Sequence, residues 1–432
     1  MKFPGKRKSK HFFPVQESGR MKITEDISDL GAVYIVGLEQ LLVDIEANVP
    51  FDFLQQYGIK RGESEVFSDE KFEEIYLELK KNKMLIGEFP GGAIGNTLHN
   101  FSTLSDSKSV AFGAISSPIY VGDYAYKYIT NTHSLVDMSH LHPCQGPIGR
   151  ALCLLTPDKE RSFVLGKGVM NDLDESSISE EVIKNASLVL VSAFSFRNEQ
   201  APIYRAHFKA MDLAKKYHVP IVLSLGTSEL VKNKRDFFID LIKNDINIVA
   251  MNELEAAALA DESDPLKAID HILDWTDLVL YTNGPKGLYI GAHVDDFCKR
   301  ETKDPIYTKS IRDYNRYEYS RAQLKADCKK PLKIFTHINP FMGGPAQIKN
   351  TNGAGDAALA ALLHDIAANT FHRQVLPQSE KHQHLFLTYS SIHQISKYCN
   401  RVSYEILMQN SPRLFKGLSL KDESLEDGYW AL

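Results

Sequence analysis

The sequence contains a glycine-rich run, Asn350-Thr351-Asn352-Gly353-Ala354-Gly355-Asp356, that leads directly into the apolar stretch Ala357-Ala358-Leu359-Ala360-Ala361-Leu362-Leu363. Glycines let a backbone turn its N–H groups inward, and the first turn of a helix adds unpaired donors with a partial positive charge. A turn of this kind is suited to hold a phosphate group. The run therefore predicts an anion-binding turn at the start of an apolar helix.

A carboxylate, that of Asp356, stands at the rim of this predicted phosphate site. Like charges repel, so an acid beside bound phosphate needs a role, such as accepting the proton of an attacking hydroxyl. The alternative role is structural, because aspartate also stabilises the start of a helix after a tight turn. The run by itself leaves both interpretations open.

The composition is that of an ordinary globular protein, with 43% hydrophobic and 24% charged residues in a chain of 432. A net charge of −5 and a pI near 6.3 argue against nucleic-acid binding through bulk charge. The five cysteines are scattered and form no Cys-x-x-Cys pair, so neither a zinc ribbon nor a disulfide framework is indicated. This usage suits a reducing compartment, and we expect a cytoplasmic protein.

The N-terminal residues 1–31 are predicted to form a basic and polar tail. They lack the apolar stretch of a signal peptide, and the whole chain lacks an apolar run of membrane-spanning length. We therefore expect neither secretion nor membrane insertion.

Short apolar runs rich in β-branched residues alternate with helix-like segments along the chain. Continuous apolar runs are typical of strands buried on both faces, and their alternation with helices indicates βαβ units around a mostly parallel sheet. The helix-like segments include 98–104, 206–217 and 234–242. The predicted strands lie at Ala32–Val36, Ser109–Phe112, Leu188–Val191, Ile221–Ser224, Ile246–Ala250 and Leu278–Tyr281.

Two regions interrupt this alternation of strands and helices. Residues 46–66 and 120–153 are poor in helix signals, and we expect them to form a small accessory sheet or lid. Residues 292–344 are long, charged and rich in tyrosine. A structureless loop of that length is improbable in a compact domain, so the segment predicts an elaborated hairpin or an oligomer contact.

Several residues that could carry chemistry stand just after predicted strands, where ligands bind in open parallel sheets. Asp44 could accept from two vicinal hydroxyls, or could form a cap or a salt bridge. Asn96 follows the turn Gly91-Gly92-Ala93-Ile94-Gly95 and suits sugar hydroxyls, although a purely structural turn explains the same pattern. Arg197 could bind an anion or a purine carbonyl edge, or could form a surface salt bridge.

The remaining candidates follow the later strands. Asn252 and Glu255 are three residues apart and share one helix face, so they could hold a hydrated Mg²⁺ or simply begin a helix. The turn Thr282-Asn283-Gly284-Pro285-Lys286-Gly287 could line the edge of a nucleotide.

Taken in order, these motifs resemble the ribokinase-like (PfkB) family of carbohydrate and nucleoside kinases, over about residues 32–404. The resemblance implies an α/β protein with a three-layer α/β/α fold, a central mostly parallel sheet and a small β-rich lid. The kinase domain would extend from residue 32 to 432. The cofactors implied are ATP and Mg²⁺, with K⁺ as a further candidate, and the partners are a nucleoside and ATP. We expect a homodimer, with no nucleic-acid or membrane partner.

The resemblance also implies a role for each candidate residue. Asp356 would be the catalytic base, with Gly353, Ala354 and Gly355 as the anion hole. The nucleoside would contact Gln40, Asp44, Gly91, Gly92, Gly95, Asn96 and Arg197. ATP would contact Thr282, Gly284, Gly287 and Asn352, while Asn252 and Glu255 would hold Mg²⁺ through water.

One position departs from the family pattern, because Asn350 stands where the family usually has aspartate. The change removes a negative charge near the phosphates. It would affect ion binding near the turn more than the catalytic base, Asp356, which is retained.

The resemblance implies phosphoryl transfer from ATP to the 5′-hydroxyl of a purine nucleoside. The alternatives are a sugar kinase acting on ribose or fructose and a non-catalytic nucleotide-binding regulator.

Overall fold

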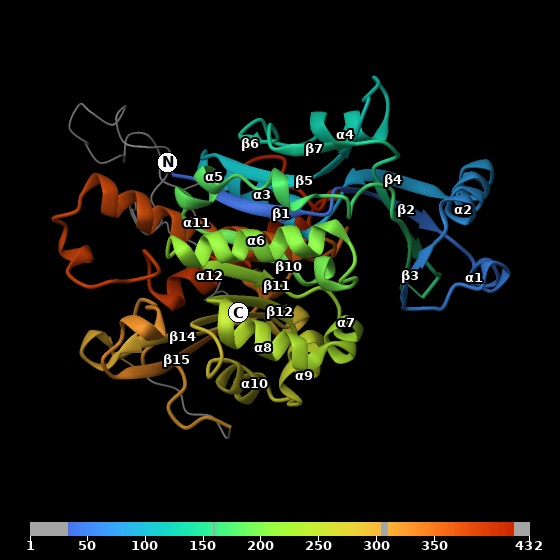
Figure 1. Ribbon diagram of the computed structural model, residues 1–432. Coiled ribbons are helices and arrows are strands. Elements are labelled where there is room, and N and C mark those ends of the chain that lie inside the picture. The colour runs from blue at the N-terminus through green and yellow to red at the C-terminus, as the bar shows by residue number, and fades with distance from the viewer. Residues whose placement is uncertain (1–32, 159, 304–309, 419–432) are drawn as a thin grey trace.

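The computed structural model describes residues 33–158, 160–303 and 310–418. In these residues the chain builds a ten-stranded sheet (Figure 1). Nine of its strands follow the order β15-β14-β13-β12-β11-β10-β1-β5-β6, and the tenth, β7, also pairs with β5. Its strands are β1 (Ile35–Glu39), β5 (Ser109–Ser116), β6 (Val136–Asp137), β7 (Leu141–Cys144), β10 (Val189–Ser192), β11 (Ile221–Ser224), β12 (Ile248–Asn252), β13 (Leu278–Thr282), β14 (Leu288–Asp295) and β15 (Pro331–Ile338).

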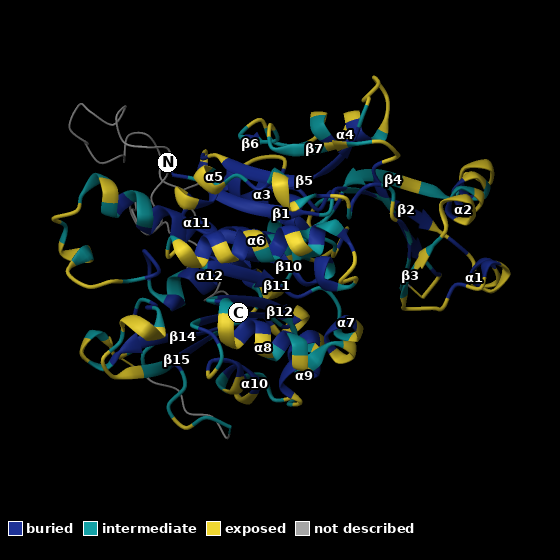
Figure 2. Cartoon of the chain, in the orientation of Figure 1, coloured by how far each residue is buried: buried dark blue, intermediate teal, exposed yellow. Residues whose placement is uncertain are grey.

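The six predicted strands are confirmed as β1, β5, β10, β11, β12 and β13, with shifts of up to a few residues at their ends. All neighbouring pairs among them are parallel. These strands are buried nearly throughout, which explains why they read as continuous apolar runs (Figure 2).

Helices cover both faces of this sheet and make the predicted three layers. Leu190 of β10 points to one core, whereas Val189 and Val191 point to the other. The first core is closed by α3 (Ala93–Ser105), α11 (Ala354–Val375) and α12 (Ile392–Leu407). The second is closed by α5 (Glu180–Lys184), α6 (Pro202–Lys216), α7 (Ser228–Asn233), α8 (Arg235–Asp245), α9 (Glu253–Ala260) and α10 (Pro265–Ile272).

A second, five-stranded sheet projects from one end of the large sheet (Figure 1). Helix α2 lays Phe72, Ile75 and Leu79 into a third hydrophobic core that this sheet shares. The sheet has the order β3-β9-β8-β2-β4, and its helices are α1 and α2. The elements are β2 (Leu42–Asn48), α1 (Phe51–Tyr57), β3 (Ser64–Phe67), α2 (Asp69–Lys81), β4 (Leu85–Pro90), β8 (Gly149–Leu155) and β9 (Arg161–Gly166).

Part of the region 120–153, which was expected to belong to the accessory sheet or lid, joins the large sheet instead. In residues 120–153, only β8 belongs to the small sheet, whereas β6 and β7 both pair in parallel with β5 of the large sheet. Helix α4 (Tyr124–Thr130) lies before them. The physical reason is that β5 is long and would otherwise leave its outer edge unpaired.

The long segment 292–344 contains the end of β14 and the whole of β15. These two strands pair antiparallel and extend the large sheet beyond β13. Residues 304–309 of this segment and the predicted tail 1–31 lie outside the described residues. Among the described residues, the helices are all too short or too polar to cross a membrane.

Candidate active site

The glycine-rich turn and the helix after it take the conformation that the sequence predicts. Gly353 has a φ of +78°, and α11 begins at the next residue, Ala354. A side chain at position 353 would collide with Pro412, whereas one at Gly355 would meet open space. The buried residues 357–369 anchor the helix in the core. Asp356 therefore lies in the first turn of a firmly held helix.

Two cavities meet at this helix start. The larger has a volume of about 640 Å³ and the smaller about 330 Å³. Both are lined by Asp356 together with Ala93, Phe194 and Gly226. Asp356 thus lies where the two cavities adjoin.

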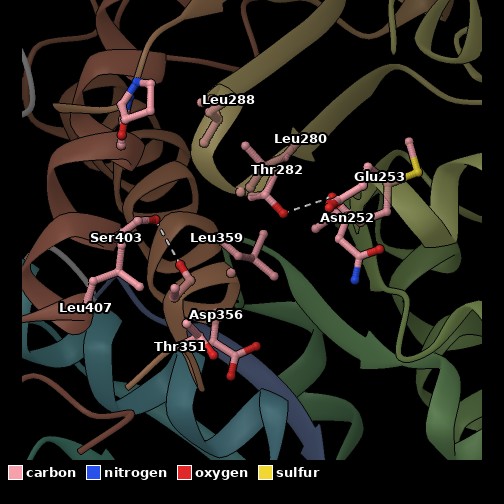
Figure 3. A pocket seen from close by; sticks show the side chains of 18 of the residues that line it. Asn252, Glu253, Leu280, Thr282, Leu288, Thr351, Asp356, Leu359, Ser403 and Leu407 are labelled. Carbon is pink, nitrogen blue, oxygen red and sulfur yellow. Dashed lines mark hydrogen bonds between the residues drawn. The ribbon is translucent and has the colours of Figure 1, made fainter. Parts of the chain in front are cut away.

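The larger cavity collects most of the residues predicted to contact ATP and metal. Figure 3 shows Asn252 and Thr282, from the ends of neighbouring parallel strands, around the same pocket as Asp356. Two side-chain hydrogen bonds fix its walls: Thr282 donates to Met251 O at 3.4 Å, and Ser403 donates to Ala354 O at 2.9 Å. The other predicted residues on its walls are Ala354, Gly355, Glu255, Gly284 and Gly287.

The smaller cavity collects most of the residues predicted to contact the nucleoside. Its lining includes the polar side chains of Asp44, Asn96 and Asp356, and also the apolar side chains of Phe163, Leu165, Met170 and Phe194, which together are called its apolar wall. The other predicted residues that line it are Gln40, Gly92, Arg197 and Gly353. Asn352, predicted to contact ATP, also lines this cavity rather than the larger one.

Two predicted glycines lie behind the cavity walls. A side chain at Gly91 would come within 2.5 Å of the Asp44 carboxylate. One at Gly95 would come within 2.3 Å of the Tyr128 hydroxyl and 2.9 Å of Arg413. Gly95 therefore makes room for the layer of side chains behind the site, and neither glycine lines either cavity.

A short chain of hydrogen bonds holds the Asp356 carboxylate. Asn96 Nδ2 donates to Asp356 Oδ2 at 3.1 Å, and Arg413 Nε donates to Asn96 Oδ1 at 3.0 Å. Burial raises the pKa of Asp356 to about 7, against the opposing effects of the Asn96 hydrogen bond and the Arg413 charge. Such a carboxylate can take up and release a proton near neutral pH.

Arg413 is only 2% exposed and donates to several groups besides Asn96. Its guanidinium reaches Thr132 Oγ1 at 2.7 Å, the Tyr128 hydroxyl at 3.0 Å and Gly91 O at 3.2 Å. The arginine therefore ties the chain after α12 to α3, to the end of β4 and to the α4 region.

Arg413 is also the cation that balances the buried acids of the site. Burial raises the pKa of Asp44 to about 7 and that of Glu39 well above its ordinary value, and the charge of Arg413 opposes both shifts.

The turn before α11 is held by the small sheet. Glu46 of β2 accepts from Asn350 Nδ2 at 3.0 Å and from Asn352 Nδ2 at 3.1 Å. Arg161 of β9 donates to Asn350 Oδ1 at 3.2 Å and also to Asn352. Asn350, the departure from the family pattern, thus uses its amide both as a donor and as an acceptor.

The predicted metal residues form the start of α9 in a capping box. The Asn252 side chain accepts from the Glu255 backbone N–H at 2.9 Å, and Glu255 accepts from the Asn252 N–H at 3.0 Å. Burial raises the pKa of Glu255 to about 7. Within the described residues, no group of three or more His, Cys, Asp or Glu could hold a metal directly. The pair fits a hydrated ion reached through water, because a buried carboxylate at a cavity wall gains from a nearby cation.

The comparisons with known proteins agree with this architecture. The sequence profile of the pfkB family carbohydrate kinases matches residues 62–304. Guanosine-inosine kinase of Escherichia coli K12 is 47% identical over 432 residues, which cover 100% of both chains. The chain belongs to the pfkB family. The expected ribokinase-like kinase, a phosphotransferase with a hydroxyl acceptor, is therefore confirmed.

Solved structures share the pfkB fold of this chain. A probable sugar kinase from Rhizobium etli CFN 42 has a TM-score of 0.65 at 17% identity, covering 90% of this chain and 97% of its own. Adenosine kinase from Sinorhizobium meliloti has a TM-score of 0.64 at 18% identity, covering 89% and 97%. At these identities the likeness shows the fold alone.

Sequence reasoning missed four charged residues of this pfkB site: Glu39, Glu46, Arg161 and Arg413. Their partners lie far away along the chain, as with Arg413 and Asn96, which are separated by 317 positions. The only local signal is at Glu39, an acid at the end of an apolar strand that needs a partner when buried.

We expect the Arg413→Met substitution to lower the free energy of unfolding by roughly 3–5 kcal/mol, because it leaves buried carboxylates without their cation. Urea unfolding measures the change. Arg316→Met is the matched control, since Arg316 is partly exposed and pairs with Glu301 at 3.4 Å. The control should cost less than about 1 kcal/mol. Equal losses in the two variants would contradict the balancing role.

Proposed function

We propose that this protein transfers the terminal phosphoryl group of ATP to the 5′-hydroxyl of a purine nucleoside, with guanosine and inosine as substrates. One observation carries the proposal: Asp356 lines both cavities at their junction, at the start of a helix. A phosphoryl donor on one side and a hydroxyl acceptor on the other would meet at that carboxylate. The 47% identity to guanosine-inosine kinase over the full chain supports the choice of acceptor.

The residues that line each cavity indicate which substrate it would bind. ATP would occupy the larger one, along Thr282, Gly284 and Gly287. The nucleoside would occupy the smaller one, with its ribose hydroxyls donating to Asp44 and its base against the apolar wall. That wall contains Phe163 and Phe194, and it favours a flat base over a simple sugar.

Catalysis would need alignment and charge stabilisation more than covalent help. Asp356 accepts the proton of the 5′-hydroxyl while the new O–P bond forms and the bond to ADP breaks. The backbone N–H groups of Gly353, Ala354 and Gly355, with the helix behind them, stabilise the charge on the transferring group. Asn96 holds the carboxylate toward the acceptor from the other side.

The polar groups around the phosphates would complete the site. Asn252 and Glu255 would hold hydrated Mg²⁺, which supplies charge neutralisation on the phosphate oxygens when it is bound. The small sheet would cover the nucleoside and exclude water, which limits ATP hydrolysis. Activation by K⁺ and assembly as a homodimer stay predictions from the family resemblance.

We expect the Asp356→Asn substitution to lower kcat by about 10²–10⁴-fold, the usual contribution of a positioned general base. Binding of ATP should be largely retained, because the cavity keeps its shape. Steady-state kinetics with guanosine and calorimetry with an ATP analogue provide the two measurements. Near-normal turnover by a folded Asp356→Asn protein would rule out the role.

The same role determines the pH dependence of the unsubstituted enzyme. A base works only in its deprotonated form, and burial raises the pKa of Asp356 to about 7, so kcat/KM should rise with pH through about that value. Glu39, Asp44, Glu255 and Arg413 lie close enough to influence this titration. A kcat/KM that stays constant from about pH 5 to about pH 8, between the pKa of an ordinary carboxylate and a value above that of buried Asp356, would contradict the assignment.

We expect the Asp44→Ala substitution to raise the KM for guanosine by about 10- to 100-fold, the value of hydrogen bonds to a charged group. The KM for ATP should change little, because Asp44 lines only the smaller cavity. Varying each substrate in turn at saturating levels of the other separates the two constants. Equal increases in both would show that Asp44 does not bind the ribose.

A further inference from the structure

The smaller cavity contains one feature that the proposed reaction does not explain, a cation facing its apolar wall. Of the described residues that line this cavity, Arg197 is the only one with a positive charge. It follows the short helical turn Ala193–Phe196 at the end of β10. The turn places it on the large sheet, at the carboxyl end of a parallel strand.

The guanidinium of Arg197 has few partners within the protein for its hydrogen-bond donors and its charge. Its carbon lies 4.7 Å from the centre of the Phe194 ring, which lines the same cavity. In the described part of the chain, its side chain makes no hydrogen bond or ion pair, and the residue is only partly exposed. Burial lowers the pKa of Arg197, and the charge that opposes this shift belongs to the exposed Glu229. A guanidinium in this state favours a ligand that offers hydrogen-bond acceptors.

The acids that line the same cavity disfavour an anion as the ligand of Arg197. Glu39, Asp44 and Asp356 all line the same space. A second phosphate or carboxylate there would be repelled by these acids when they are ionised. These surroundings therefore favour a ligand that is neutral, flat enough for the Phe163 and Phe194 wall, and rich in acceptors on one edge.

We propose that Arg197 recognises the O6 and N7 edge of a 6-oxopurine base and thereby makes the enzyme prefer guanosine and inosine to adenosine. The inference rests on the proposed function, since it assigns the base of the nucleoside to this end of the cavity. Guanine presents N7 and O6 as two adjacent acceptors, which arginine can bind with both arms of its fork. Hypoxanthine has the same edge.

Adenine presents a different edge to the same arginine. Its 6-amino group is a donor, and a guanidinium has only donors, so one pair of groups would face each other without a hydrogen bond. A site built to bind a keto oxygen discriminates strongly against a ligand that lacks one. The discrimination therefore needs no contact with the 2-amino group, which guanosine has and inosine lacks.

The test compares inosine with purine riboside, which has no substituent at carbon 6. In the unsubstituted enzyme, kcat/KM should be higher for inosine. The Arg197→Met substitution should lower kcat/KM for inosine and guanosine by about 10- to 100-fold, the value of one bidentate contact to a base. It should lower kcat/KM for purine riboside less, by about 3- to 10-fold, because that base keeps the N7 contact but has no hydrogen bond to O6 to lose.

Two further variants control the experiment. Arg197→Lys keeps the charge but not the fork, so it should restore only part of the preference for inosine. Arg205→Met removes a cation of α6 that is 53% exposed and should leave all rates unchanged. Circular dichroism and thermal unfolding confirm that each variant is folded.

The outcomes separate this inference from the proposed function. Equal losses for inosine and purine riboside in Arg197→Met would overturn the recognition of O6 while leaving the nucleoside kinase intact. An unsubstituted enzyme that forms no nucleoside 5′-monophosphate from any of these substrates would overturn both.

Discussion

One carboxylate held between two cavities is the constraint on which the rest of this structure depends. Asp356 faces both spaces from the first turn of α11, and Asn96 fixes it by a hydrogen bond from α3. Arg413 fixes Asn96 in turn and supplies the buried positive charge that opposes protonation of the acids around it. Burial and charge oppose each other here, and the result is a base whose pKa lies near neutral pH.

The small sheet takes part in the same arrangement from the opposite side. Its strands β2 and β9 contribute Glu46 and Arg161, which hold the side chains of Asn350 and Asn352 just before α11. Strand β2 also carries Asp44 into the smaller cavity. The sheet that would cover the nucleoside is therefore tied by hydrogen bonds to the turn that would receive the phosphate.

Much of the fold could be predicted from the sequence, because strands buried on both faces have continuous apolar runs. Most candidate residues could also be found, since Asn252 and Thr282 follow such strands and Gly353 and Asp356 follow a distinctive turn. Arg413, Arg161 and Glu46 could not, because their partners are more than 100 positions away and no local pattern marks them. The pairing of β6 and β7 with β5 was missed for a related reason, since residues 120–148 carry weak signals of their own.

The most direct measurement is a crystal structure of the protein with guanosine and a non-hydrolysable ATP analogue bound together. The account predicts that an Asp356 carboxylate oxygen lies within about 2.6–3.2 Å of the 5′-hydroxyl oxygen, the range for direct proton transfer. The hydroxyl should also point at the terminal phosphorus of the analogue. A 5′-hydroxyl that contacts another side chain, with Asp356 out of hydrogen-bonding range and the small sheet closed, would contradict the account.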